Sequence, residues 1–97
     1  MRIAGLKNPK VGMGCTIHYY SDAEPATVVR VSESGKTCWI RMNDTKAIGE
    51  GFWHQDWEIL DDLIGEEIRV NLRKNGWYFS SEYVELGRRY KYYDWEF

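Results

Sequence analysis

Apolar and polar residues alternate along several short stretches of this chain, with the two-residue period of a β-strand that has one buried face. These stretches are rich in β-branched and aromatic side chains, and glycine, serine, asparagine or aspartate residues bound them. The pattern therefore predicts a mainly β protein, with strands in residues 14–20, 26–31, 36–42, 53–60, 67–73 and 77–79.

The best specified hairpin begins with residues 67–73 and turns at Asn75-Gly76. Asn-Gly supplies the two positive φ angles of a type I′ turn, and a two-residue loop there pairs Leu72 with Phe79. The alternation agrees with this pairing, since polar residues fall on the opposite face. The predicted core side of the hairpin consists of Ile68, Val70, Leu72 and Phe79.

A second predicted hairpin surrounds the glycine-containing loop at residues 32–35, and two registers fit it. A loop with an even number of residues places four side chains on the core side, namely Val29, Val31, Cys38 and Ile40. A loop with an odd number and a glycine bulge instead places Trp39 beside Val29. The sequence leaves both registers open.

Two segments are expected to differ from simple strands. Residues 60–65 favour one short helical turn, with Asp61 or Asp62 as its cap and Gly65 as its stop. Residues 1–11 contain glycine and proline, and we expect them to form a loose N-terminal arm or an edge strand.

Five to seven short strands in 97 residues predict a single domain, residues 1–97, folded as a small barrel or half-barrel with at most one short helical turn. Residues 12–42 resemble the opening of an SH3-like barrel of the Tudor or KOW type. They contain a glycine-led strand, a loop with Asp22 and Pro25, a strand that ends at Val31, and a hairpin. The N-terminal half is therefore expected to be SH3-like.

The composition adds a surplus of aromatic residues and an uneven charge. Five Trp, seven Tyr and three Phe are more than the small core of such a chain needs. Residues 47–68 carry seven acidic and no basic residues, whereas basic residues are in excess in 1–46 and 69–91. Apolar residues interrupt the acidic segment, so we interpret it as a solvated face balanced by its flanks. The alternative is a surface for a basic partner, or an imitation of nucleic acid.

The chain lacks the sequence features of secretion and membrane insertion. Its first residues contain no apolar core of a signal peptide, and no run approaches the roughly 18 apolar residues of a membrane span. Cys15 and Cys38 are too few for a disulfide scaffold and lie among apolar residues. We expect a cytoplasmic protein without membrane association, whose two reduced thiols lie in the core.

The usual catalytic and metal-binding patterns are not matched. Four zinc-ligand residue types occur, namely Cys15, His18, Cys38 and His54. Cys15 and His18 are three residues apart and would point to opposite faces of a strand, which makes a shared metal unfavourable. Neighbouring carboxylates in residues 61–62 and 66–67 likewise point apart, and no glycine-rich phosphate loop is present. We expect no metal, no cofactor and no enzymatic activity.

Aromatic and cationic residues at two places are the candidate binding groups. Aromatic residues border the loop at residues 21–25, where SH3-like barrels commonly bind, and residues 88–93 place arginines beside tyrosines. Arginine binds phosphate and rings stack on bases, so this mixture could hold a nucleotide or a single strand. The alternative is that the tyrosines pack at the rim and the arginines pair with the acidic segment. The candidate binding residues are Tyr19, Tyr20, Asp22, Trp39, Arg88, Arg89, Tyr92 and Tyr93.

A set of motifs covers most of the chain in a fixed order. They are Gly-x-Gly in residues 11–14, Tyr-Ser-Asp in 19–22, Ser-Gly-Lys-Thr in 31–37, Arg-Lys-Asn-Gly-Trp in 73–77, Leu-Gly-Arg-Arg in 86–89 and Tyr-Tyr-Asp-x-x-Phe in 92–97. In combination they resemble a group of small, mostly uncharacterised proteins encoded by bacteriophages and prophages. The chain departs from this group in residues 43–60, which are shorter. The resemblance implies an accessory protein in the cytoplasm of the bacterial host, and it implies no reaction.

The expected function is stoichiometric binding to a host protein or ribonucleoprotein complex, because small phage accessory proteins often block a host component. An inhibitor of anti-phage defence, such as an anti-CRISPR protein, is one such function. One alternative is an SH3-like module that binds a nucleotide or single-stranded nucleic acid, and another is a component of the virion or of its assembly. Exposed strand edges and the aromatic C-terminal segment also allow a homodimer.

Overall fold

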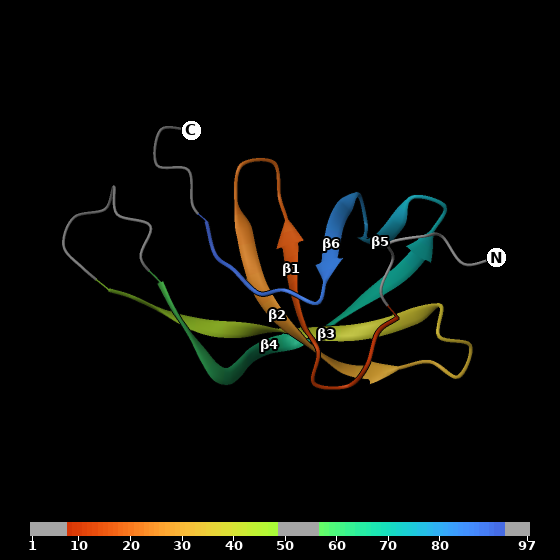
Figure 1. Ribbon diagram of the computed structural model, residues 1–97, viewed down its shortest axis with the longest axis horizontal. Coiled ribbons are helices and arrows are strands. Elements are labelled where there is room, and N and C mark those ends of the chain that lie inside the picture. Colours follow the sequence, from red (N-terminus) through yellow and green to blue (C-terminus); the bar gives the residue numbers. More distant parts are fainter. Residues whose placement is uncertain (1–7, 49–56, 93–97) are drawn as a thin grey trace.

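The computed structural model describes residues 8–48 and 57–92, which contain six β-strands and no helix (Figure 1). The strands are β1 (Gly14–His18), β2 (Ala23–Val31), β3 (Thr37–Ala47), β4 (Trp57–Arg73), β5 (Gly76–Phe79) and β6 (Glu82–Leu86). Each strand pairs antiparallel with the next, and β6 pairs with β1, so the sheet closes into a barrel. The predicted small barrel of five to seven strands is confirmed.

Alternate side chains of the six strands point inward and form the core. On β1, Cys15 and Ile17 are fully buried, and they lie opposite Leu86 and Val84 of β6. The buried core cluster consists of Cys15, Ile17, Ala26, Val28, Cys38, Ile40, Val70, Trp77, Val84 and Leu86. Trp77 supplies the largest of these side chains, although its indole Nε1 has no hydrogen-bond partner within the described ranges. The aromatic surplus in the composition therefore contributes one ring to the fully buried core, and most of the other described rings lie nearer the surface.

The hairpin of β2 and β3 combines an even loop with a bulge. Val31 pairs with Cys38 and Arg30 with Trp39, as an even loop requires, but the register shifts beyond Arg30. Val29 is the extra residue, and it leaves Val28 opposite Ile40 in the core. The even register is therefore present next to the loop, but its inward position for Val29 is wrong, because the bulge moves the residues of β2 that precede Val29 to the other face.

The hairpin of β4 and β5 exists, but its register differs from the prediction by two residues. Leu72 pairs with Trp77 and Arg73 with Gly76, so Lys74-Asn75 forms the loop. Asn75 does not adopt a positive φ, whereas Gly76 has φ 143°, so the two positive angles of a type I′ turn are not both present. Because the register shifts by an even number of residues, the same side chains of the hairpin still point inward. Leu72, however, now lies at the end of the hairpin, where it is 37% exposed instead of buried in the core.

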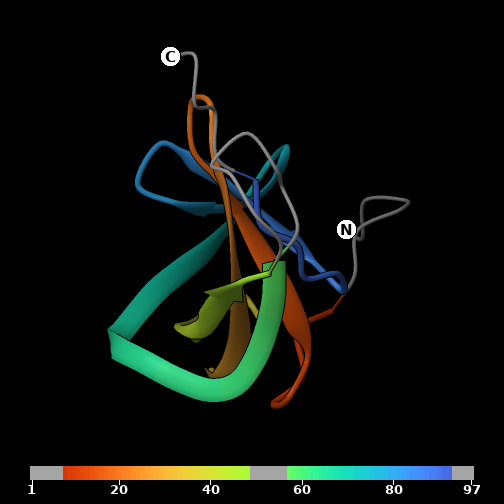
Figure 2. The same ribbon diagram turned by 90° about the vertical axis from the view of Figure 1, so that its left-hand side faces the viewer.

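The predicted helical turn in residues 60–65 is wrong, because β4 passes through this segment as a continuous strand of 17 residues. Pairing with β3 decides the conformation, since Asn43 pairs with Leu63 and Met42 with Ile64. Gly65 has φ 76°, and β4 bends sharply along its length in Figure 2. The glycine that looked like a helix stop therefore permits a bend in a strand.

Side chains of β3 also hold the bent part of β4. The Arg41 guanidinium donates from Nε to the carbonyl oxygen of Gly65, at 3.0 Å, and from Nη2 to that of Leu63, at 3.2 Å. Asn43 is buried and donates from Nδ2 to the carbonyl oxygen of Leu60 at 2.8 Å. These side-chain hydrogen bonds satisfy carbonyl groups around the bend that would accept backbone hydrogen bonds in a regular strand ladder.

The segment before β1 is attached to the barrel rather than forming a strand of its own. The Gly12 amide donates to the Val28 carbonyl oxygen at 2.8 Å, and Pro9 is buried. Residues 1–7 of the predicted arm, and residues 53–56 of the predicted strand 53–60, lie outside the described residues.

Replacing Gly65 tests whether its backbone conformation sets the bend. No atom lies within 4 Å of a Cβ built at Gly65, so Gly65→Ala introduces no clash and the cost arises from φ 76° alone. We expect Gly65→Ala to lower the free energy of unfolding by about 1 kcal/mol in urea titration. Gly65→Asn should lose clearly less, because asparagine tolerates the left-handed region. Equal losses in the two variants would contradict this explanation.

Candidate functional site

Three rings lie side by side on the outer face of the barrel, at positions that alternate with core residues. Tyr78 of β5 pairs with Tyr83 of β6, and Tyr83 pairs with His18 of β1. Cross-strand partners point to the same side of a sheet, so their rings meet. The Tyr78 and Tyr83 centroids are 5.8 Å apart with an edge arrangement, and the Tyr83 and His18 centroids are 5.6 Å apart and stacked.

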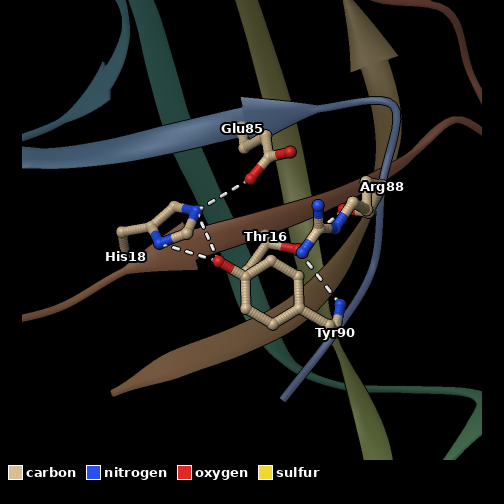
Figure 3. Close-up of polar contacts among 5 residues, drawn as sticks. All are labelled: Thr16, His18, Glu85, Arg88 and Tyr90. Atoms are coloured by element: carbon tan, nitrogen blue, oxygen red, sulfur yellow. Dashed lines mark hydrogen bonds and ion pairs between the residues drawn. The ribbon is translucent and has the colours of Figure 1, made fainter. Parts of the chain in front are cut away.

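A fourth ring comes from the segment after β6. The Tyr90 ring lies edge-on to His18 with centroids 5.5 Å apart, and its hydroxyl is 3.2 Å from each ring nitrogen of His18 (Figure 3). His18 Nε2 is also 3.0 Å from Glu85 Oε1, so the imidazole is held from two sides. We call His18, Tyr78, Tyr83 and Tyr90 the ring row.

Residues 87–92, which we call the strap, cross the outer face of β1 and β2 and carry Tyr90 into the ring row. Thr16 Oγ1 donates to the Arg88 carbonyl oxygen at 2.6 Å and accepts from the Tyr90 amide at 3.1 Å (Figure 3). Thr16 points outward, yet it is completely buried because the strap covers it. One hydroxyl thus fixes the strap at the residues on either side of Arg89.

The far end of the strap is tied to the start of β2. The backbones of Ala23 and Tyr92 exchange two hydrogen bonds, at 2.8 and 2.9 Å. Lys91 Nζ donates to both carboxylate oxygens of Glu24 at 2.8 Å, in a pair whose side chains are 12% and 23% exposed. The same ammonium lies 4.8 Å from the ring centroid of Trp57 on β4. The strap therefore joins β1, β2 and β4 outside the barrel.

Two arginines stand beside the ring row. The Arg88 guanidinium lies 4.3 Å from the centroid of Tyr90, and the Arg73 guanidinium lies 5.4 Å from the centroid of Tyr78. Among the described residues, neither has a carboxylate oxygen within 4.0 Å. Stacking on a ring leaves the N–H groups at the edge of a guanidinium able to donate to another molecule.

Arg89 has a structural role instead. Its Nε and Nη2 donate to Thr27 Oγ1 at 3.2 and 3.0 Å. The side chain also lies over Gly14, where a Cβ would be 2.7 Å from Arg89 Cγ. This close approach accounts for the glycine at the start of β1, since any side chain there would displace the arginine.

The structure places the predicted binding residues in three groups. Tyr19, Tyr20 and Asp22 form the turn between β1 and β2, where the Tyr19 amide donates to the Asp22 carbonyl oxygen at 2.8 Å. Tyr92 lies next to this turn, because it pairs with Ala23. Tyr20 is 91% exposed, whereas Tyr19 packs partly against the core. Burial, together with the charges of Glu24 and Glu82, raises the pKa of Tyr19.

The remaining predicted residues lie apart from this turn. Arg88 and Arg89 are both on the strap, and only Arg88 stands at the ring row. Trp39 lies on β3, two strands from β1, with the Arg30 guanidinium 3.8 Å from its centroid. Arg30 also pairs with Glu67 at 2.8 Å, so these residues form a separate contact on another part of the surface. Tyr93 lies outside the described residues.

The prediction of binding residues omitted all four rings of the ring row, namely His18, Tyr78, Tyr83 and Tyr90, and it also omitted Arg73. The signal that could have found Tyr78 and Tyr83 is the alternation in residues 77–79 and 82–86. It places these two tyrosines on the outer face of the sheet, away from the buried face of Trp77 and Val84. Their convergence with His18, however, depends on the pairing of β1 with β6.

The two thiols are core groups. Cys15 and Cys38 are fully buried and free. Burial, reinforced by the charge of Cys38 and opposed by that of Arg89, raises the pKa of Cys15 from 9.0 to about 12, and burial raises that of Cys38 to about 11. Within residues 8–48 and 57–92, no group of three or more His, Cys, Asp and Glu is placed to hold a metal ion. His54 lies outside these ranges.

Comparison with known proteins gave no match to a family model, to a curated protein or to a solved structure. In the part of the chain that the structure describes, no helix is of a length and hydrophobicity that would cross a membrane.

Thr16→Val tests the attachment of the strap, because valine has the shape of threonine without the hydroxyl. Losing both hydrogen bonds should lower the free energy of unfolding by about 1–3 kcal/mol and speed amide exchange at Tyr90. Thr37→Val is the matched control, since Thr37 Oγ1 makes one hydrogen bond, to Asn71 at 3.0 Å. Unchanged exchange at Tyr90 in Thr16→Val would show that the hydroxyl does not hold the strap.

The raised thiol pKa values predict a loss of stability in alkaline solution. Below about pH 9 the thiols are protonated in both states, so they give stability no pH dependence. Above pH 9 the unfolded thiols ionise while the folded ones stay neutral until pH 11–12, so stability falls by up to about 1.4 kcal/mol per pH unit for each thiol. Urea titrations between pH 8 and 10.5 measure this fall, and Cys15→Ala or Cys38→Ala should each make it shallower. An unchanged slope in both variants would exclude the thiols as its cause.

Proposed function

We propose that this protein is a small phage-encoded binding protein that acts without catalysis in the cytoplasm of a bacterial host. It associates stoichiometrically with a host protein or ribonucleoprotein complex and inhibits its function in anti-phage defence. The phage origin rests on the combination of sequence motifs, and the binding role rests on the surface of the barrel.

The observation that carries this proposal is the ring row with its two arginines. Tyrosine and arginine are enriched at binding interfaces, and they dominate the free energy of binding when they are held rigidly. Tyr83 is 39% exposed and is held between two neighbouring rings, so it would lose little side-chain entropy on binding. The two thiols are buried and therefore not accessible as nucleophiles.

A second candidate function is the binding of single-stranded nucleic acid or a nucleotide. The specific observation in its favour is that Arg73 and Arg88 each stack on a tyrosine and have no carboxylate partner among the described residues. Guanidinium groups in this state are suited to phosphate. The two candidate functions are compatible if the host component is a ribonucleoprotein.

Capture from bacteria under phage challenge tests the first proposal. The wild-type protein should retain a host partner in equimolar amount and should raise the plaque count on a bacterial strain that carries the corresponding defence system. The double variant Arg73→Gln/Arg88→Gln should lose both effects. Arg30→Gln/Lys46→Gln removes the same charge from exposed side chains of β2 and β3 that lie away from the ring row, beside Trp39 and opposite Glu58 respectively, and it should keep both effects.

Two outcomes would overturn this proposal. One is the absence of any equimolar host partner together with an unchanged plaque count in every defended strain tested. The other is the recovery of the protein in purified phage particles at fixed copy number, which would identify it as a virion component.

A further inference from the structure

We infer that the ring row and its two arginines form a binding surface for single-stranded nucleic acid, which within the proposed function is the exposed strand of the host ribonucleoprotein. This inference rests on the proposed binding role and specifies what the ring row contacts. It follows from the spacing of the rings, from the contacts of the two arginines, from the aromatic and charged side chains at the described positions of this face, and from the charge around it.

The rings form a contiguous row in which the planes of neighbouring rings are inclined by 65°, 29° and 62°. Successive centroids from Tyr78 through Tyr83 and His18 to Tyr90 are 5.8, 5.6 and 5.5 Å apart, and the rings come from β5, β6, β1 and the strap. Proteins that bind single strands without sequence preference stack successive bases on aromatic side chains carried by a barrel surface. Unpaired bases, unlike those of a duplex, have faces free to stack on such side chains.

The arginines supply the complementary charge. Arg73 accompanies Tyr78 at one end of the row, and Arg88 accompanies Tyr90 at the other. A strand laid along the rings would therefore have a guanidinium at each end for its phosphates, and charge-assisted hydrogen bonds of this kind are short and strong. Among the described residues, Glu85 is the one carboxylate that contacts the row, with its Oε1 3.0 Å from His18 Nε2.

At the described outward positions of β1, β5 and β6 the face carries no aliphatic side chains, so it offers aromatic rings and charged groups to a ligand. The outward residues of β1 and β6 next to the row are Thr16, His18, Tyr83 and Glu85. Here the available interactions are stacking and charge, and single-stranded nucleic acid offers both.

Charge elsewhere on the barrel disfavours a long duplex. The acidic residues of β4, namely Glu58, Asp61, Asp62, Glu66 and Glu67, are all exposed, and the chain has a net charge of −2. These carboxylates would repel a rigid duplex that extends beyond the ring row. A flexible strand of about four nucleotides can follow the row without approaching them.

Fluorescence anisotropy with a labelled 12-nucleotide oligouridylate, an oligothymidylate of equal length and a hairpin duplex tests the inference. We expect the single strands to bind more tightly than the duplex, with affinity that falls as salt rises. Tyr83→Leu should weaken binding roughly 5- to 150-fold, the range measured for losing one stacked base. Arg73→Gln/Arg88→Gln should make affinity less sensitive to salt: the negative slope of log affinity against log salt should become shallower by about 1.4.

The matched control is Arg30→Gln/Lys46→Gln, which also removes two positive charges from exposed side chains. It should leave affinity within about twofold of the wild-type value, because Arg30 contacts Trp39 and Lys46 lies opposite Glu58 of β4. All variants are compared at equal folded fraction by circular dichroism. The inference is overturned if the wild-type protein binds neither oligonucleotide at low salt, or if the control variant weakens binding as much as the Arg73 and Arg88 variant does.

This experiment separates the inference from the proposed function. If a host partner is captured through Arg73 and Arg88 and the complex survives ribonuclease and deoxyribonuclease while oligonucleotides do not bind, the ring row contacts protein and the inference fails alone. If oligonucleotides bind as expected but no host partner and no change in plaque count are found, the inference holds and the proposed function fails.

Discussion

The pairing of β1 with β6 is the constraint on which the rest of the structure depends. It buries Cys15 and Ile17 against Leu86 and Val84, and so it closes the barrel. The same register puts His18 beside Tyr83 on the outside, because inward and outward residues alternate on both strands. One ladder of hydrogen bonds thus determines the centre of the core and the centre of the ring row together.

The outer surface is organised by polar groups that secure chain segments rather than by further apolar packing. The Thr16 hydroxyl fixes the strap, and Lys91 with Glu24 fixes its far end in a largely buried ion pair. A buried pair of this kind contributes little net stability, but removing one partner is costly because the other charge remains buried. These contacts specify the path of residues 87–92, and that path puts Tyr90 and Arg88 in place.

The sequence was sufficient to predict the barrel, because the two-residue alternation and the turn residues agree along most of the chain. It was not sufficient for the registers. The bulge at Val29 and the Gly65 bend depend on pairing with β3, and local signals such as Asp61 and Gly65 favoured a helical turn that this pairing overrode. The Arg88 region was recognisable from its composition, whereas the ring row joins Tyr83 to His18 across 65 residues, a contact that no local pattern encodes.

The long sequence separation of the β1 and β6 partners has a consequence for how the molecule is made. Cys15 meets Leu86, and Thr16 meets the strap at Tyr90, so loops of about 70 residues must close before these contacts form. Topologies of this kind have high contact order and fold slowly. During synthesis β1 would lack one of its two neighbours until β6 had emerged from the ribosome. We therefore expect the barrel and its outer surface to form together in a single cooperative step, once β6 and residues 87–92 have been synthesised.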